Sequence, residues 1–137
     1  MNRQFITLSS IEICRVKKRV SLIIMIVFYF IAGVNHFRNP AAYYRIIPDY
    51  LPYPYLINLL SGLAEIFLAI LLIVPLTRKI AAYGIVVMLI VFIPAHIYMI
   101  QKGWCVDPEH CLPAWVAWIR LVPLQFLLMW WAWNNRK

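Results

Sequence analysis

The chain has 137 residues, of which 64% are hydrophobic and 13% are charged, and its mean hydropathy is +0.78. A soluble core of this size cannot bury that much apolar surface, so the composition excludes a water-soluble globular protein and predicts an integral membrane protein. The formal net charge of +8 accompanies no recognisable nucleic-acid-binding motif.

The first 19 residues form a basic lead-in to an apolar run. Residues 1–19 mix apolar and polar side chains and end on Lys17-Lys18-Arg19, so we predict a frayed or interfacial cytoplasmic segment. The run that follows, VSLIIMIVFYFIAG, also resembles the apolar region of a signal peptide. Because no clear small-residue cleavage site follows it, we expect the run to remain as a membrane span.

Four apolar segments are long enough to cross a hydrocarbon core of about 30 Å at about 1.5 Å per residue. Polar residues or prolines interrupt the last three, which the interior of a bundle tolerates better than a lipid-facing helix does. The predicted fold is therefore all-α, an integral membrane four-helix bundle formed by residues 20–137. Its spans are expected at about 20–37, 55–76, 80–100 and 112–133.

The stretch RNPAAYYRIIPDYLPYPY joins the first two predicted spans. Its prolines break it too often for a span, while its tyrosines and isoleucines make it too apolar for a solvated loop. Tyrosine rings collect at the level of the lipid headgroups. We therefore predict an interfacial Pro/Tyr-rich cap on the outer side of the bundle.

Lysine and arginine are distributed unevenly over the predicted loops, and positively charged loops stay cytoplasmic. Nine of them precede the first span, fill the turn at Arg78-Lys79 or close the chain, whereas the other side receives only Arg38, Arg45 and Lys102. Both termini are therefore expected in the cytoplasm of a multi-pass protein of the cell (inner or plasma) membrane. The basic charge then reflects topology and attraction to membrane lipid, and no nucleic-acid partner is predicted.

Small and polar residues share one face of the second span and one face of the first. Asn58, Gly62 and Glu65 recur at helical spacing, and larger apolar residues cover the rest of that helix. Gly33 and His36 repeat this spacing in the first span, where a small residue lets a neighbouring helix approach closely. We predict that these two faces meet inside the bundle.

Residue counts along the spans predict which polar side chains share a depth. Glu65 lies about 15 Å and Arg120 about 12 Å below the outer ends of their spans. An unpaired charge at that depth costs several kcal/mol, so a Glu65–Arg120 pair is expected. His96 lies about 6 Å below the outer end of the third span, and His36 lies near the outer end of the first. All four side chains are predicted to share one cavity in the outer half.

This cluster has two interpretations. Interhelical hydrogen bonds can hold a membrane bundle together without any ligand. Alternatively, ionisable residues inside a membrane are rare and costly, and their convergence is typical of a site for a small molecule, a quinone or a proton. The residues of the candidate ligand site or polar cluster are Asn35, His36, Asn58, Glu65, His96 and Arg120.

Cys105 and Cys111 lie in the short polar stretch WCVDPEHC before the fourth predicted span. On the outer side of the membrane a disulfide between them would persist, and this is the expected pairing. A metal site with His110 and a redox-active dithiol are the alternatives, but the spacing is wider than either usually shows, so no metal is predicted. Cys14 lies on the reducing side and is expected to be a free thiol.

Several motifs together resemble the DoxX-like family of small membrane proteins over roughly residues 20–133. They are AGVNHFRNPAAYYRIIPDYLP, LLSGLAEIFLAILLIVPLTRKIAAYGIVVMLIVFIPAHIYM and the plan of four spans. That heterogeneous family is similar to the membrane subunit of thiosulfate:quinone oxidoreductase, and it includes relatives linked to redox maturation in methylamine utilisation and animal receptor-assembly chaperones. The resemblance implies the fold and a redox association but no particular reaction, and the cysteine loop is outside its pattern.

Two functions follow as expectations, and whether the chain is an enzyme stays open. The first is a redox-associated membrane subunit that holds a quinone or other lipid-soluble small molecule, with His36 or His96 bonded to a carbonyl and Glu65 and Arg120 tuning proton uptake. The second is a non-enzymatic assembly factor or accessory subunit for another membrane or exported protein. No intrinsic cofactor motif is evident, so a redox partner protein, a diffusible quinone or a homo-oligomer is the expected partner.

Overall fold

The computed structural model describes residues 2–105 and 111–137, and it is helical apart from short connections and one small ribbon. In the ribbon, β1 and β2 pair antiparallel with Cys105 opposite Cys111. The elements in chain order are α1 (Asn2–Arg38), α2 (Pro40–Tyr44), α3 (Pro54–Ile73), α4 (Arg78–Lys102), β1 (Trp104–Cys105), β2 (Cys111–Leu112), α5 (Ala114–Ile119), the π-helix η1 (Arg120–Leu124) and α6 (Gln125–Asn134).

The predicted all-α four-helix bundle is confirmed. Four helices are long and apolar enough to cross a membrane, at Glu12–Arg38, Pro54–Ile73, Arg78–Lys102 and Ala114–Asn134. Large apolar side chains such as Phe67 and Trp130 are more than half exposed on their outward faces. A contiguous apolar exterior of this kind is suited to lipid, and the chain is a multi-pass membrane protein.

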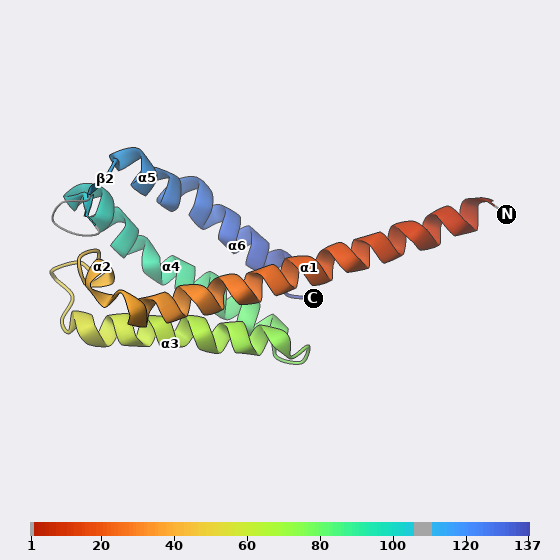
Figure 1. Ribbon diagram of the computed structural model, residues 1–137, viewed down its shortest axis with the longest axis horizontal. Helices are drawn as coiled ribbons and strands as arrows, with labels where there is room; N and C mark the ends of the chain where they lie inside the picture. The colour runs from red at the N-terminus through yellow and green to blue at the C-terminus, as the bar shows by residue number, and fades with distance from the viewer. Residues whose placement is uncertain (1, 106–110) are drawn as a thin grey trace.

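The first span begins much earlier as a helix than the sequence indicates. Helix α1 is continuous from Asn2 and extends well beyond the other helices (Figure 1). The frayed alternative is therefore wrong for residues 2–19, whereas an interfacial position in the cytoplasm stays a prediction. No proline or glycine occurs in that segment, so nothing interrupts the backbone hydrogen bonds on the way into the apolar run.

Helix α3 ends at Ile73, before the predicted end at residue 76. Val74 is extended, with φ −85° and ψ 119°, because the ring of a following proline disfavours the helical conformation in the preceding residue. Thr77 then closes the turn by donating its hydroxyl to the Leu71 carbonyl at 2.7 Å. Helix α4 starts at the next residue.

The fourth span is continuous through α5, η1 and α6. Pro123 lies within η1 and lacks the N–H that an α-helical turn would use. The wider π-turn at Arg120–Leu124 accommodates this missing donor. The π-turn therefore changes the direction of Arg120, its first residue, and of Gln125, the residue after it, relative to a regular α-helix.

Helix α1 packs along α3, α3 along α4, and α4 along the fourth span. We call the end of the bundle with α2 and the β-ribbon the ribbon end, and the end with the α3–α4 turn and the last residues of the chain the turn end. Figure 1 shows that α1 and the fourth span lie close at the turn end and separate toward the ribbon end. Contacts of Trp131 with Ser21 and Phe28 join the two helices near the turn end.

The predicted Pro/Tyr-rich cap covers the ribbon end. Helix α2 and the loop after it fold back over the bundle, and Pro48 of this loop is completely buried. Tyr50 and Tyr53 of the same loop are 71% and 75% exposed. The buried part of the cap therefore closes this end of the bundle, while its exposed tyrosines suit an interfacial position.

Candidate ligand site

A cavity of about 530 Å³ lies between the four spanning helices beneath the cap. We call it the ribbon-end cavity. Its volume falls within the range of about 300–1,000 Å³ that is typical of small-molecule sites. Aromatic and aliphatic side chains form most of the wall, and polar groups come from every span. These polar residues are Tyr29 and His36 of α1, Asn58, Ser61 and Glu65 of α3, His96 of α4, and Arg120 and Gln125 of the fourth span.

A close crossing of α1 and α3 places His36 in this cavity. A Cβ added to Gly62 would lie 2.7 Å from the His36 Cβ and 3.0 Å from the Gly33 carbonyl oxygen, and one added to Gly33 would lie 2.8 Å from the Gly62 oxygen. The two backbones can approach this closely only because both residues lack a side chain. The predicted meeting of these two helix faces is confirmed.

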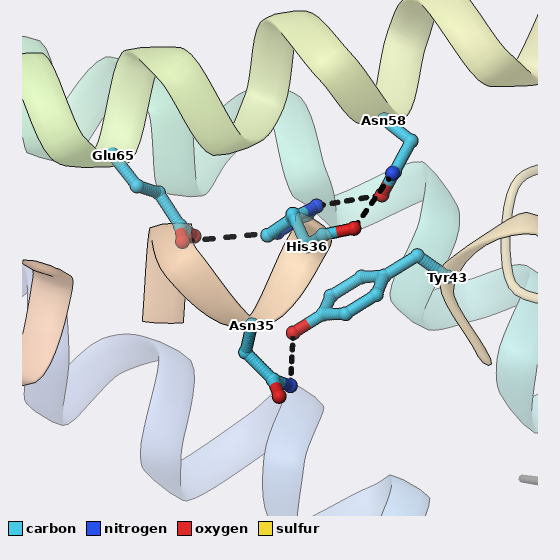
Figure 2. Close-up of polar contacts among 5 residues, drawn as sticks. All are labelled: Asn35, His36, Tyr43, Asn58 and Glu65. Carbon is cyan, nitrogen blue, oxygen red and sulfur yellow. Dashed lines mark hydrogen bonds and ion pairs between the residues drawn. The ribbon is translucent and has the colours of Figure 1, made fainter. Parts of the chain in front are cut away.

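Asn58 fixes the orientation and the tautomer of His36 (Figure 2). The Asn58 Nδ2 amide donates to the His36 backbone carbonyl at 3.1 Å, which turns Oδ1 toward the ring. His36 Nδ1 lies 2.7 Å from that oxygen, and because an amide oxygen only accepts, Nδ1 carries the proton. The other ring nitrogen, Nε2, is then directed to the opposite side.

His36 Nε2 faces the carboxylate of Glu65, and its distance to Oε2 is 3.7 Å. Both side chains are less than one-tenth exposed. A neutral Nε2 and an ionised carboxylate are both acceptors, so their juxtaposition is favourable only when one of them holds a proton or a donor bridges them. The pair is thus suited to hold or to accept one proton.

Tyr43 of α2 covers one flat face of the His36 ring. The two rings stack with centroids 3.7 Å apart, and Asn35 Nδ2 donates to the Tyr43 hydroxyl at 2.8 Å (Figure 2). Burial raises the pKa of Tyr43 above its usual value, so the hydroxyl stays protonated and can donate in turn. Asn35 therefore acts from outside the cavity wall and holds the cap on the site.

His96 and Arg120 form a second polar contact in the cavity. His96 Nδ1 donates to the Phe92 carbonyl at 2.7 Å, so Nε2 accepts from the Arg120 Nε–H at 3.1 Å. The Arg120 charge also interacts electrostatically with Glu65. The ion pair of Glu65 within 4 Å is with His36, and a direct Glu65–Arg120 pair stays a prediction.

Two oxygen atoms in the cavity wall have no hydrogen-bond partner among the described residues. They are the hydroxyl of Tyr29, a residue that is 2% exposed, and Oε2 of Glu65, which is 7% exposed. Leaving a buried polar group unpaired costs about 1–3 kcal/mol, so native structures seldom keep one without a role. These two atoms mark where a bound molecule would be held.

Five of the six candidate site residues line the cavity, and Asn35 supports it from behind. Sequence reasoning gave no role to Tyr43 or Gln125. Gln125 is a buried polar residue in an apolar span, and its side-chain amide donates to the Leu89 carbonyl. Its isolation in that span was a readable signal, whereas the position of Tyr43 depends on how the cap folds.

The cysteines pair as expected. Cys105 and Cys111 form a disulfide that closes the β-ribbon, and Cys14 is an exposed free thiol. His110, which the alternative metal site would use together with the two cysteines, lies outside the described residues. Arg45 Nη1 donates to the Cys105 carbonyl at 3.4 Å, which joins the ribbon to the cap.

A family described as a domain of unknown function, DUF8561, matches residues 25–136. The match includes all the residues that line the ribbon-end cavity, from Phe28 to Leu128. No curated protein and no solved structure matches the chain. The chain therefore belongs to the DUF8561 family.

Proposed function

We propose that this protein is a redox-associated, DoxX-like membrane subunit that binds a quinone or a similar lipid-soluble small molecule in the ribbon-end cavity. The observation that carries the proposal is that two buried oxygen atoms in one cavity, of Tyr29 and Glu65, have no hydrogen-bond partner among the described residues. A ligand with a polar head would satisfy both atoms at once, which the described residues alone do not.

The shape of the cavity supports an amphipathic ligand with an apolar tail. Phe28 and Leu124 line it from α1 and the fourth span, and they are 42% and 37% exposed on the outside of the bundle. These two helices separate toward the ribbon end (Figure 1). A tail could therefore pass between them into lipid while the head remains inside.

The polar groups of the cavity suit both the oxidised form of the head, a quinone, and its reduced form, a hydroquinone. The Tyr29 hydroxyl can donate to a quinone carbonyl, and an ionised Glu65 can accept from the hydroxyl of a hydroquinone. Oxidation of a hydroquinone to a quinone releases two protons and two electrons, and Glu65 and the neighbouring His36 can each take up one of these protons. In this proposal the electrons come from or go to a partner protein, and the chain supplies the binding site.

We further propose that both termini are cytoplasmic and that the ribbon end faces outward from the cell (inner or plasma) membrane. The turn end carries Arg78, Lys79, Arg136 and Lys137, and positively charged segments remain on the cytoplasmic side. The disulfide at the ribbon end fits an oxidising compartment. Membrane-impermeant thiol labelling of intact cells should reach Cys105 and Cys111 only after reduction. Labelling of Cys14 without permeabilisation would contradict this orientation.

The binding proposal is tested with Tyr29→Phe in the purified protein. Titration with a benzoquinone that carries a decyl tail, followed by tryptophan fluorescence and by thermal unfolding, should show saturable binding to the natural protein. The variant should bind about tenfold more weakly, which corresponds to about 1.4 kcal/mol for one hydrogen bond lost to the ligand. The ligand-free variant should be at least as stable as the natural protein, because it loses no hydrogen bond and no longer buries an unpaired hydroxyl.

Tyr83→Phe is the matched control. Tyr83 of α4 packs against Trp133 with ring centroids 5.6 Å apart and does not line the cavity, so its variant should bind normally. Equal weakening in both variants would show that the effect is not local to the cavity. Absence of saturable binding to the natural protein would reject the quinone proposal and favour the assembly-factor function.

A further inference from the structure

A second, smaller hollow of about 180 Å³ lies at the turn end, at the opposite end of the bundle from the ribbon-end cavity. We call it the basic hollow. Three separate segments of the chain form it: the inner part of α1, the start of α4 and the last residues of the chain. Its lining residues are Arg15, Lys18, Arg19, Leu22, Arg78, Asn135 and Lys137.

Five of the seven residues that line the basic hollow are cationic, and none is acidic. Residues 15, 18, 19 and 22 follow each other at helical spacing, so α1 presents them on one face. The two ion pairs found among the side chains that the structure describes, in residues 12–103, 105 and 111–137, join other residues, His36 with Glu65 and Lys102 with Asp49. Positive charge is thus gathered here without an acidic side chain to balance it.

The hollow is held in shape by hydrogen bonds around it. Ser21 Oγ accepts from Trp131 Nε1 at 2.8 Å and from Asn135 Nδ2 at 3.2 Å, which fixes the end of α6 against α1. Arg78 Nε donates to the Leu72 carbonyl at 3.2 Å, which leaves its two terminal nitrogens for another acceptor. The cations therefore converge on one place because the fold positions them.

We propose that the basic hollow binds the phosphate headgroup of an anionic phospholipid. Arginine and lysine are the usual ligands of phosphate groups, and basic pockets between spanning helices suit lipid headgroups. Its volume suits a headgroup better than a larger metabolite. Leu22 belongs to the apolar part of the first span, and Arg15 lies two helical turns before Leu22, toward the start of that span. The hollow therefore lies where the span leaves the hydrocarbon core.

The test compares the natural protein with a triple variant in which Arg15, Lys18 and Arg19 are all replaced by glutamine. Both proteins are purified in neutral detergent and supplied with phosphatidylglycerol or with phosphatidylcholine of the same acyl chains. Bound lipid is counted by native mass spectrometry, and protection is measured by thermal unfolding. The natural protein should retain phosphatidylglycerol preferentially, and the variant should lose at least about tenfold in apparent affinity for it.

A second triple variant is the matched control, because it removes the same charge from the same end but outside the hollow. It carries glutamine at Lys17, Lys79 and Arg136, which do not line the hollow, and it should retain phosphatidylglycerol. Equal loss in both triple variants would overturn the proposal in favour of bulk charge. Equal protection by inorganic phosphate would overturn it in favour of a soluble phosphate ligand.

If the first triple variant does not fold, the pair Arg15→Gln and Lys18→Gln replaces it, because both side chains are exposed and neither makes a hydrogen bond that would be lost from the core. The pair should weaken phosphatidylglycerol retention relative to Lys17→Gln and Lys79→Gln. Identical retention by the two pairs would contradict a defined site.

Discussion

The two ends of the bundle differ in how the polar groups that face its interior are satisfied. At the turn end, Ser21 accepts hydrogen bonds from Trp131 and Asn135, and the helices close on each other. At the ribbon end, Tyr29 and Glu65 are buried but keep oxygen atoms without a hydrogen-bond partner among the described residues. The polar contacts between α1 and α6 at the turn end are thus satisfied within the fold, whereas those of the ribbon-end cavity are completed by a ligand in the function we propose.

Helix α1 contributes to both ends of the bundle, and it has two different neighbours there, α3 and the fourth span. Against α3 it is held along the bundle by the Gly33–Gly62 crossing, which leaves little freedom to move. Against the fourth span it is joined near the turn end, through Trp131. Opening and closing of the ribbon-end cavity would therefore involve the fourth span and the cap more than α3.

The largest expected effect comes from filling the helix crossing that positions the site. Gly62→Ala would place a Cβ 2.7 Å from the His36 Cβ and 3.0 Å from the Gly33 backbone oxygen, so the helices must separate. We expect a loss of about 2–3 kcal/mol in the free energy of unfolding, measured by thermal or denaturant unfolding in detergent.

Gly84→Ala is the control for that prediction. Its added Cβ would meet the Leu68 Cδ2 at 2.6 Å, at the end of a side chain that can rotate away. The higher helix propensity of alanine offsets part of the cost, so a change below about 1 kcal/mol is expected. Equal losses at both positions would mean that the α1–α3 backbone contact is not special.

Next in size is the coupling between His36 and Glu65. Each single change to leucine leaves its partner buried without its counterpart, so the double variant should recover at least about 1 kcal/mol relative to the sum of the single losses. A second double-mutant cycle, with Glu65→Gln and Arg120→Leu, tests the Glu65–Arg120 pair, which is predicted because the two residues lie at similar depths. Strictly additive losses of stability for His36 and Glu65 would show that the two side chains do not stabilise each other, although His36 Nε2 and Glu65 Oε2 lie 3.7 Å apart.

A smaller effect is expected at the closed turn end. Ser21→Ala removes the acceptor of two hydrogen bonds, although Asn135 Nδ2 retains its bond to the Trp131 carbonyl at 2.9 Å. A loss of about 1 kcal/mol in unfolding free energy is expected. Tyr29→Phe, at the open end, should cost nothing in the absence of ligand. If the two variants lost the same stability, the contrast between the two ends would not hold.

Depth and spacing predicted much of the site because both are properties of single helices. The small and polar face of α3 lies toward α1, and five of the six named residues line one cavity. Contacts between helices depend also on rotation about each axis, which residue counts do not give. The π-turn at Arg120–Leu124 and Pro94 within α4 change that rotation, and Arg120 donates to His96.

The cap shows a second limit of sequence reasoning. Its proline and tyrosine content predicts where it lies, but the short helix α2 that brings Tyr43 onto His36 has only five residues and no strong signal of its own. Such a segment takes its conformation from what it packs against. For residues 2–19 the sequence predicted too little structure. These residues form a helix because the absence of helix breakers outweighs their mixed polarity.

The smallest expected effect concerns how the cap is fastened at the ribbon end. The Asp49 carboxylate accepts a hydrogen bond from the Tyr98 hydroxyl and lies 3.5 Å from Lys102 Nζ, and the Tyr98 bond foremost holds the pKa of Asp49 below its usual value. A carboxyl whose pKa is lowered by folding stabilises the fold above its ordinary pKa of about 3.9, and this contribution is lost as pH falls through the folded-state value.

Asp49→Asn should therefore lower the unfolding temperature slightly at pH 6, and the difference should shrink toward zero as the pH falls through the lowered pKa of Asp49 in the folded protein. Because the Asp49 side chain is 78% exposed, solvent and salt screen the interaction, and the difference at pH 6 should diminish in high salt. A difference that persisted unchanged at low pH would mean that the carboxylate charge does not hold the cap. In that case the aromatic stacking of Tyr43 on His36 would be its main attachment.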